Sequence, residues 1–168
     1  MLLEDKTAVV YGGGGSVGGA VARAFAREGA RVFLAGRTLA ALEEVAAELA
    51  GAGAVVETAR VDALDEAAVD AHADAVAERA GGIDVAFSAI RYGDVHRPLL
   101  ELAVEDFTVP IGNAMRAHFL TTRAAARHMT RQGSGVIMAI TATTGRLSIP
   151  EVGATGVVFD AIESACRQ

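Results

Sequence analysis

A run of glycines is the first feature of this chain that suggests chemistry. Gly12 to Gly15 stand in a row and Gly18 follows, so that Gly13, Gly15 and Gly18 match the pattern G-x-G-x-x-G. A β-branched run precedes these glycines and a helical pattern follows them. Unpaired N–H groups at a helix N-terminus attract phosphate, and glycine lets the phosphate approach the backbone. The run predicts a site for the pyrophosphate of a dinucleotide. The alternative is a flexible turn, because four consecutive glycines make the match unspecific.

An arginine marks the end of the next β-branched run. A carboxylate about 20 residues after the glycines would bind the ribose 2′-hydroxyl of NAD. Gly36 and Arg37 occupy that position instead. A guanidinium binds phosphate through two parallel hydrogen bonds. Without a carboxylate at this position, the 2′-phosphate of NADP is not repelled. Arg37 therefore predicts NADP as the cofactor, with NAD less favoured. The alternative is a solvated arginine at a strand end.

The hydrophobic pattern predicts the elements that position these residues. Short apolar runs alternate with longer stretches of helical spacing, which is typical of strands buried in a parallel sheet and of the helices that connect them. The expected strands are residues 7–11, 31–35, 54–61, 83–90 and 135–141. The expected helices run from Val17 to Gly29, from Thr38 to Gly51, over 65–80 and 104–130, and from about 155. The predicted fold class is α/β, a doubly wound parallel sheet flanked by helices.

Composition excludes several classes of function. The 168 residues are 52% hydrophobic and 21% charged, which is typical of one globular domain over residues 1–168. The net charge of −6, with scattered Lys and Arg, argues against nucleic acid and membrane partners. Cys166 is the only cysteine, so an internal disulfide and a multi-cysteine metal site are excluded, and a cytoplasmic location is expected. No histidine pattern has metal-ligand spacing.

These residues together resemble the short-chain dehydrogenase/reductase family, from Lys6 to the end of the chain. YGGGGSVGGAVA stands in place of that family's T-G-x-x-x-G-x-G, with Tyr11 for the threonine. The resemblance implies a single NAD(P)-binding domain of Rossmann-like fold. The cofactor residues expected in the glycine turn and at the start of the helix are Gly12, Gly13, Gly15, Ser16, Val17 and Gly18.

Two later segments carry the resemblance further. VDALDEAAV, residues 61–69, is similar to the family's stretch after the third strand, where Asp62 would bind the adenine amino group. A helix-capping aspartate is the alternative. SAIR, residues 88–91, replaces the family's N-N-A-G. With Ser88 and Ala89 the backbone could still follow the cofactor, but the polar contacts of the family's asparagine side chains would be lost.

The family's catalytic residues are replaced in this chain. The resemblance puts Ala114, Ala142, Thr155 and Phe159 at the positions of the usual Asn, Ser, Tyr and Lys. A threonine hydroxyl does not ionise near neutral pH and phenylalanine carries no charge, so the usual proton relay cannot operate.

Substitutes for the lost groups lie nearby in the sequence. Tyr92 and His96 follow the fourth expected strand, at the carboxyl end of the sheet, where substrates bind in such folds. Thr141 and Thr143 flank the serine position and offer hydroxyls to a carbonyl oxygen, while Thr155 takes the tyrosine position. The alternative for each is a loop or strand-end residue bonded to solvent or backbone.

Three hypotheses of function remain open. The first is an NADP(H)-dependent oxidoreductase for a small carbonyl or alcohol substrate, with a non-standard proton donor. The second is a non-catalytic NADP(H)-binding module, acting as a sensor or partner subunit. The third is a fragment of a longer reductase, because the family continues with two more strands and this chain stops at Gln168. The resemblance also implies a homo-oligomer.

Overall fold

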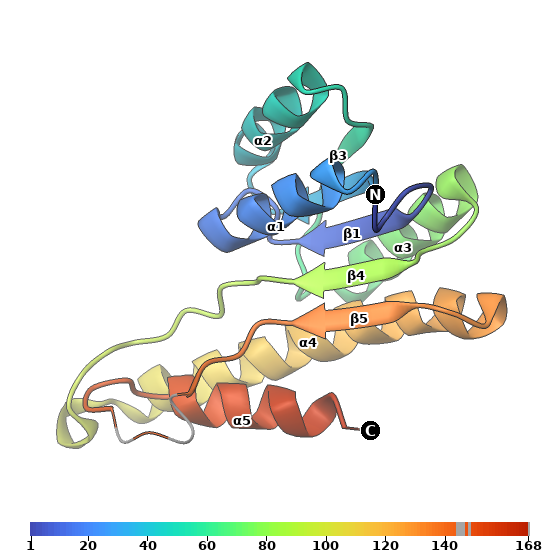
Figure 1. Ribbon diagram of the computed structural model, residues 1–168. Coiled ribbons are helices and arrows are strands. Elements are labelled where there is room, and N and C mark those ends of the chain that lie inside the picture. Colours follow the sequence, from blue (N-terminus) through green and yellow to red (C-terminus); the bar gives the residue numbers. More distant parts are fainter. Residues whose placement is uncertain (144–146, 148, 168) are drawn as a thin grey trace. The chain divides into compact units, whose positions relative to one another are not determined.

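The computed structural model has the predicted alternation of strands and helices (Figure 1). It describes residues 1–143, 147 and 149–167. Contacts divide the chain into two compact units. The first unit comprises Met1–Ala89 and Leu120–Met138, and the second comprises Ile90–Phe119 and Ala139–Gln168. Each unit is described by itself, and one domain over the whole chain stays a prediction.

A parallel sheet forms the centre of the first unit. Its five strands lie in the order β3-β2-β1-β4-β5. Strand β1 pairs in parallel with β2 and β4, and β2 pairs in parallel with β3. The bounds are Thr7–Tyr11 for β1, Arg31–Gly36 for β2, Val56–Arg60 for β3, Val85–Ser88 for β4 and Val136–Ala139 for β5. The predicted α/β class and parallel sheet are confirmed, although β3, β4 and β5 are shorter than expected.

Helices cover both faces of this sheet. Helices α1 (Ser16–Arg27) and α2 (Leu39–Gly51) pack on one face, where Ala8 and Val10 of β1 share a core with residues of both helices. Tyr11, one residue beyond Val10, contacts α3 (Glu66–Ala80) on the other face. Figure 1 shows α1 in front of the sheet and α3 behind it. The side chains of β1 alternate between the two faces because a strand has a period of two.

The helix ends differ in part from the sequence prediction. Gly29, after α1, has a φ of 92°, as expected of a residue that ends a helix. Asp65 rather than Asp62 is the N-cap of α3, and its side chain accepts a hydrogen bond from the Ala68 amide. Helix α2 has the predicted bounds, with Thr38 as its N-cap and Gly51 as its last residue, and the residue with positive φ that follows it is Gly53.

Helix α4 (Val104–Gln132) contributes to both units. Its second half belongs to the first unit and is joined to α3 by ion pairs. Arg127 Nη2 lies 2.9 Å from Asp70 Oδ1, and Arg123 Nη2 lies 2.7 Å from Glu66 Oε1. These pairs explain why the adjacent faces of both helices are charged.

The second unit contains the first half of α4, the short 3-10 helix η1 (Leu99–Glu101) and helix α5 (Thr155–Ala165). Its core is formed by Ala114 of α4 with Val158 and Ile162 of α5. Among the residues that the structure describes, no helix is both long and apolar enough to span a membrane. Within the same residues, no group of three His, Cys, Asp or Glu side chains is placed to hold a metal ion.

Candidate functional site

The glycine turn joins the end of β1 to the start of α1. Gly12 has a φ of 82°, a conformation that favours glycine. A Cβ atom at Gly18 would lie 2.2 Å from the Gly12 carbonyl oxygen, so no side chain fits there. The Gly12 and Gly13 amides both donate to the Ala35 carbonyl, at 2.8 and 3.3 Å, and the Gly15 amide donates to the Gly12 carbonyl at 3.0 Å. The turn is therefore held against β2 and against the first turn of α1.

The Gly12, Gly13 and Gly15 amides already have acceptors, and the start of α1 offers further donors to a ligand. The first N–H groups of a helix have no acceptor within the helix. At α1 these groups include Ser16 and Val17, which are both exposed. The N-cap residue Gly15 provides no side-chain cap, and the first turn of α1 has no acidic residue. A bare, uncharged helix N-terminus behind a turn without side chains fits a pyrophosphate group.

The ends of the neighbouring strands adjoin this turn. Tyr11 at the end of β1 is in register with Ala35 of β2 and with Ser88 of β4. The Ala89 amide donates to the Tyr11 carbonyl at 2.9 Å. Ser88 and Ala89 thus lie at the same edge of the sheet as the glycine turn.

Arg37 and Asp62 follow β2 and β3 at this edge, and both are exposed. In the part of the chain that the structure describes, the Arg37 guanidinium makes no hydrogen bond or ion pair. Asp62 Oδ1 accepts from the Leu64 amide at 3.0 Å, and its backbone carbonyl accepts from Asp65. Asp62 therefore closes a turn before α3, which occupies one of its two carboxylate oxygens.

A contact between buried Tyr11, at the start of the glycine turn, and half-buried His72 was not predicted from the sequence. The Tyr11 hydroxyl lies 3.3 Å from His72 Nδ1, and the two rings meet edge to face. Burial raises the pKa of Tyr11, with a further contribution from the charge of Asp70. Burial, assisted by the charge of Arg79, lowers the pKa of His72 to about 4. The sequence signal for this pair was Tyr11 at the family's threonine position, with His72 on an otherwise small and acidic helix.

The second unit brings together two of the residues considered for catalysis, Tyr92 and Thr155, with Phe159 at the position of the family's lysine. Tyr92 packs edge to face on Phe159, with ring centroids 6.3 Å apart. The Asn113 side-chain amide donates to the Tyr92 carbonyl at 3.4 Å, which ties α4 to the loop after β4. Thr155, at the start of α5, is buried, and its Oγ1 makes no geometrically acceptable hydrogen bond with any described residue.

The Tyr92 hydroxyl and the Thr155 hydroxyl influence each other. Burial raises the pKa of Tyr92, the Thr155 hydroxyl lowers it in part, and the charge of Asp94 raises it again. The two hydroxyls are thus close enough to interact, although their geometry falls short of a full hydrogen bond. A buried hydroxyl without a strong partner is available to a ligand oxygen.

The other candidate hydroxyls belong to Thr141 and Thr143, and the remaining candidate is His96. Thr141 is half-buried and Thr143 is exposed, both in the segment after β5. Among the described residues, no hydrogen bond joins either threonine side chain to Tyr92 or Thr155. His96 Nε2 lies 2.7 Å from Asp94 Oδ2, so this exposed histidine is bonded within its own loop.

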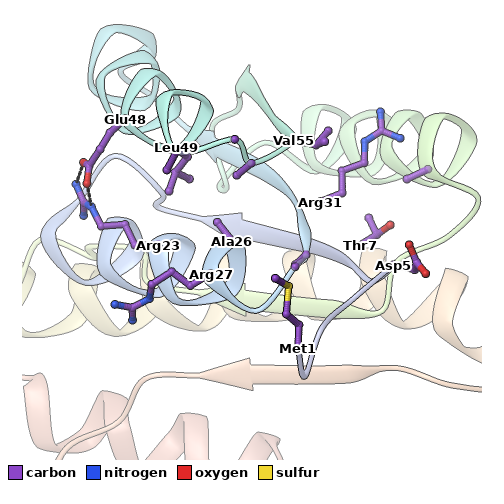
Figure 2. Close-up of a pocket in the computed structure, with 16 residues that line it drawn as sticks. Met1, Asp5, Thr7, Arg23, Ala26, Arg27, Arg31, Glu48, Leu49 and Val55 are labelled. Carbon is purple, nitrogen blue, oxygen red and sulfur yellow. Dashed lines mark hydrogen bonds and ion pairs between the residues drawn. The ribbon is translucent and has the colours of Figure 1, made fainter.

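A groove of about 810 Å³ lies elsewhere in the first unit (Figure 2). Thr7 and Arg31, which line it, begin β1 and β2, so it lies at the opposite end of these strands from the glycine turn. Figure 2 shows Arg23 bonded to Glu48 at its rim. None of the predicted site residues lines this groove. Its position therefore gives it no part in the predicted cofactor site.

Comparisons with known proteins agree with the geometry of the first unit. An uncharacterized oxidoreductase of Mycobacterium tuberculosis is 32% identical over 98% of this chain and 63% of its own length. NAD⁺-bound xylitol dehydrogenase is structurally similar, with a TM-score of 0.93, 27% identity, and coverage of 98% of this chain and 64% of that one. A metagenomic short-chain oxidoreductase in complex with NADP has a TM-score of 0.88 and 27% identity, over 98% of this chain and 75% of that one.

This chain thus spans less than two thirds of its curated relative from Mycobacterium tuberculosis. Its residues 6–154 match the sequence model of the family described as short chain dehydrogenase. That match covers the parallel sheet, the glycine turn and the loop that carries Tyr92. The chain is a member of the short-chain dehydrogenase family.

Proposed function

We propose that this protein is an NADP(H)-dependent oxidoreductase that acts on a small carbonyl or alcohol substrate. The observation that carries the proposal is the uncapped N-terminus of α1 behind a glycine turn that has no room for a side chain at Gly18. Similar structures include one complex with NADP and one with NAD⁺, which supports the binding of a dinucleotide. The preference for NADP over NAD is argued from this chain's own residues.

The first unit would hold the cofactor through five contacts. The Ser16 and Val17 amides would bind the pyrophosphate, and the Ser16 hydroxyl adds a further donor. Arg37, unpaired among the described residues, would bind the 2′-phosphate that distinguishes NADP from NAD. The second carboxylate oxygen of Asp62 would accept from the adenine amino group. When bound, NADPH supplies the hydride.

The second unit would provide the proton. Tyr92 is the candidate donor, because burial raises the pKa of its phenol and keeps the proton in place at neutral pH. Tyr92 would donate its phenolic proton to the carbonyl oxygen of the substrate, and solvent would then reprotonate the phenolate. Thr155 would stabilise that phenolate, since its hydroxyl already lowers the Tyr92 pKa. Thr141 and Thr143 remain proposed as donors to the substrate oxygen.

A second function is supported by the surroundings of Tyr92. Phe159 stands against the phenol at the position where the family's lysine would place a cation. Without that charge, phenolate formation costs more. We therefore keep a non-catalytic NADP(H)-binding module, a sensor or partner subunit, as the second candidate.

Substitution of Ser16 tests the cofactor site without depending on catalysis. Ser16→Asp puts a carboxylate in the first turn of α1, which favours the helix but repels a pyrophosphate. We expect unchanged or higher thermal stability and at least about a tenfold loss of NADPH affinity, measured by calorimetric titration. The matched variant Ser16→Ala should lose less than about threefold. Equal NADPH affinity in Ser16→Asp and Ser16→Ala would show that the phosphates lie elsewhere.

A turnover assay separates the two candidate functions. NADPH oxidation is measured with wild-type protein that binds NADPH and with a panel of aldehydes and ketones. At least one of these substrates should cause NADPH to be consumed. Binding without any turnover would favour the non-catalytic module. From the family resemblance we also propose a cytoplasmic homo-oligomer, which light scattering and cell fractionation would test.

A further inference from the structure

We propose that Arg60, at the end of β3, is a second residue that selects the 2′-phosphate of the cofactor. This inference rests on the proposed NADP(H) binding and adds a specificity residue to it. Arg37 was identified by its position after the second strand, whereas Arg60 is far from the glycine motif in sequence and is brought to the site only by the pairing of the strands.

The register between β2 and β3 places Arg60 beside the end of β2. Gly36 is the register partner of Arg60, and the Val61 amide donates to the Gly36 carbonyl at 2.9 Å. Neighbouring strands are about 4.8 Å apart, and paired residues of parallel strands project to the same face of the sheet. An arginine side chain is long enough to cross that gap. Arg60 can therefore reach the space next to the residue that precedes Arg37.

Gly36 keeps that space open. A Cβ atom at Gly36 would contact only Leu42 of α2, at 3.5 Å or more. The glycine therefore provides no side chain between Arg60 and the start of α2. A larger residue at this position would separate the two arginines from a common ligand.

The start of α2 adds to the positive potential beside the ends of β2 and β3, which we call the Arg60 corner. Thr38 stands at the N-cap, but its side chain makes no capping hydrogen bond. The first turn of α2 contains no acidic residue. The N–H groups of this 13-residue helix therefore face the Arg60 corner without a protein anion to satisfy them.

Two arginines that approach β3 from neighbouring elements, Arg31 of β2 and Arg79 of α3, have a carboxylate partner. Arg31 and Arg79 both bind Glu57, which lies on the same strand as Arg60. Arg60 is exposed and, like Arg37, has no hydrogen bond or ion pair with the residues that the structure describes. With both side chains turned toward the uncapped start of α2, these two cations would repel each other in the free protein. A dianionic phosphate would relieve that repulsion, which a ribose hydroxyl cannot do.

The test compares two adenosine ligands that contain no nicotinamide, so it does not depend on catalysis. Adenosine 2′,5′-bisphosphate and adenosine 5′-monophosphate are titrated calorimetrically into the wild type, Arg60→Gln, Arg37→Gln and the double variant. Arg27→Gln is the matched control. It removes the same charge from an exposed arginine in the last turn of α1, at the opposite end of that helix from the glycine turn.

We expect Arg60→Gln to weaken the bisphosphate about five- to tenfold and the monophosphate by less than about twofold. Arg27→Gln should change neither affinity by more than about twofold. An Arg60→Gln protein that keeps the wild-type ratio of the two affinities, while Arg37→Gln loses it, overturns the role of Arg60 and leaves the proposed function intact. A wild-type protein that binds both ligands equally overturns the NADP(H) preference itself, and the Arg60 inference with it.

Discussion

The Tyr11 hydroxyl lies 3.3 Å from Nδ1 of His72, and this contact joins the strand that leads into the glycine turn to helix α3. Tyr11 is buried and His72 is half-buried, and burial with the charge of Arg79 lowers the His72 pKa to about 4. The imidazole is therefore neutral in the folded protein at neutral pH. Its charge state connects the stability of the first unit to pH.

Acid should destabilise the protein through His72. Because the folded pKa is below the ordinary value of 6.5, the unfolded chain binds the proton first, and stability present above pH 6.5 is lost as the pH falls toward 4. Between pH 8 and pH 5, the free energy of unfolding should fall by about 2 kcal/mol less in His72→Gln than in the wild type. Urea denaturation at both pH values measures this difference. His96→Gln, on an exposed loop, is the control, and an unchanged pH dependence in His72→Gln would contradict the role of burial.

Two glycines of the turn should respond differently to alanine. At Gly18 a Cβ atom would lie 2.2 Å from the Gly12 carbonyl oxygen, so Gly18→Ala should cost about 3 kcal/mol or more of stability. At Gly15 the backbone is extended and the nearest atom is 3.4 Å away, so Gly15→Ala should cost no more than about 1 kcal/mol. Gly15→Ala should nevertheless lower NADPH affinity about tenfold, because its methyl group narrows the phosphate approach. Thermal unfolding and titration measure the two effects. Equal stability of the two variants would contradict the packing of α1 on the turn.

Gly36→Asp should reverse the cofactor preference. The position has room for a Cβ atom, with Leu42 at 3.5 Å, so the variant should fold. Its carboxylate would bind ribose hydroxyls and repel a 2′-phosphate, so we expect NADPH affinity to fall and NADH affinity to rise, each about tenfold. Gly36→Ala is the control for bulk without charge. A preference unchanged in Gly36→Asp would place the adenosine ribose away from the end of β2.

Tyr92→Phe should remove turnover while the protein still binds NADPH. Loss of a proton donor lowers kcat by about 10²- to 10⁴-fold. The ring contact with Phe159 is kept in the variant, so the packing of the second unit should survive. Steady-state kinetics and NADPH titration are compared with those of the wild type. A kcat within threefold of the wild-type value would assign the proton to another group.

Thr155→Val tests whether the buried hydroxyl is reserved for a ligand. The Thr155 Oγ1 atom lacks a well-formed hydrogen bond among the described residues, so a methyl group in its place should leave stability unchanged or raise it by up to about 1 kcal/mol. If the hydroxyl serves the reaction, kcat should fall in the same variant. A loss of more than about 1 kcal/mol in the unfolding free energy would instead show that Thr155 is bonded in the folded protein.

Local patterns in the sequence predicted the fold, the glycine turn and the position of Arg37 after β2. Apolar runs and helical spacing determine which segments become strands and helices, because they decide which surfaces must be buried. Gly12 and Gly18 were identifiable in the same way, since a positive φ and a close backbone approach are needs that only glycine meets locally. Arg37 was identifiable because it follows directly on a strand that the pattern already defined.

Relationships between distant segments were decided by the tertiary structure alone. The contact of Tyr11 with His72, the register of Gly36 with Arg60 and the meeting of Tyr92 with Thr155 each join residues that no local pattern links. Strand order and register are set by the packing of the whole core, and a shift of two residues would bring a different side chain beside Gly36 without changing the pattern of burial. The sequence by itself therefore determined the elements and the glycine turn. The residues that lie near that turn from other elements, such as His72 and Arg60, are brought there only by the packing of the strands and helices.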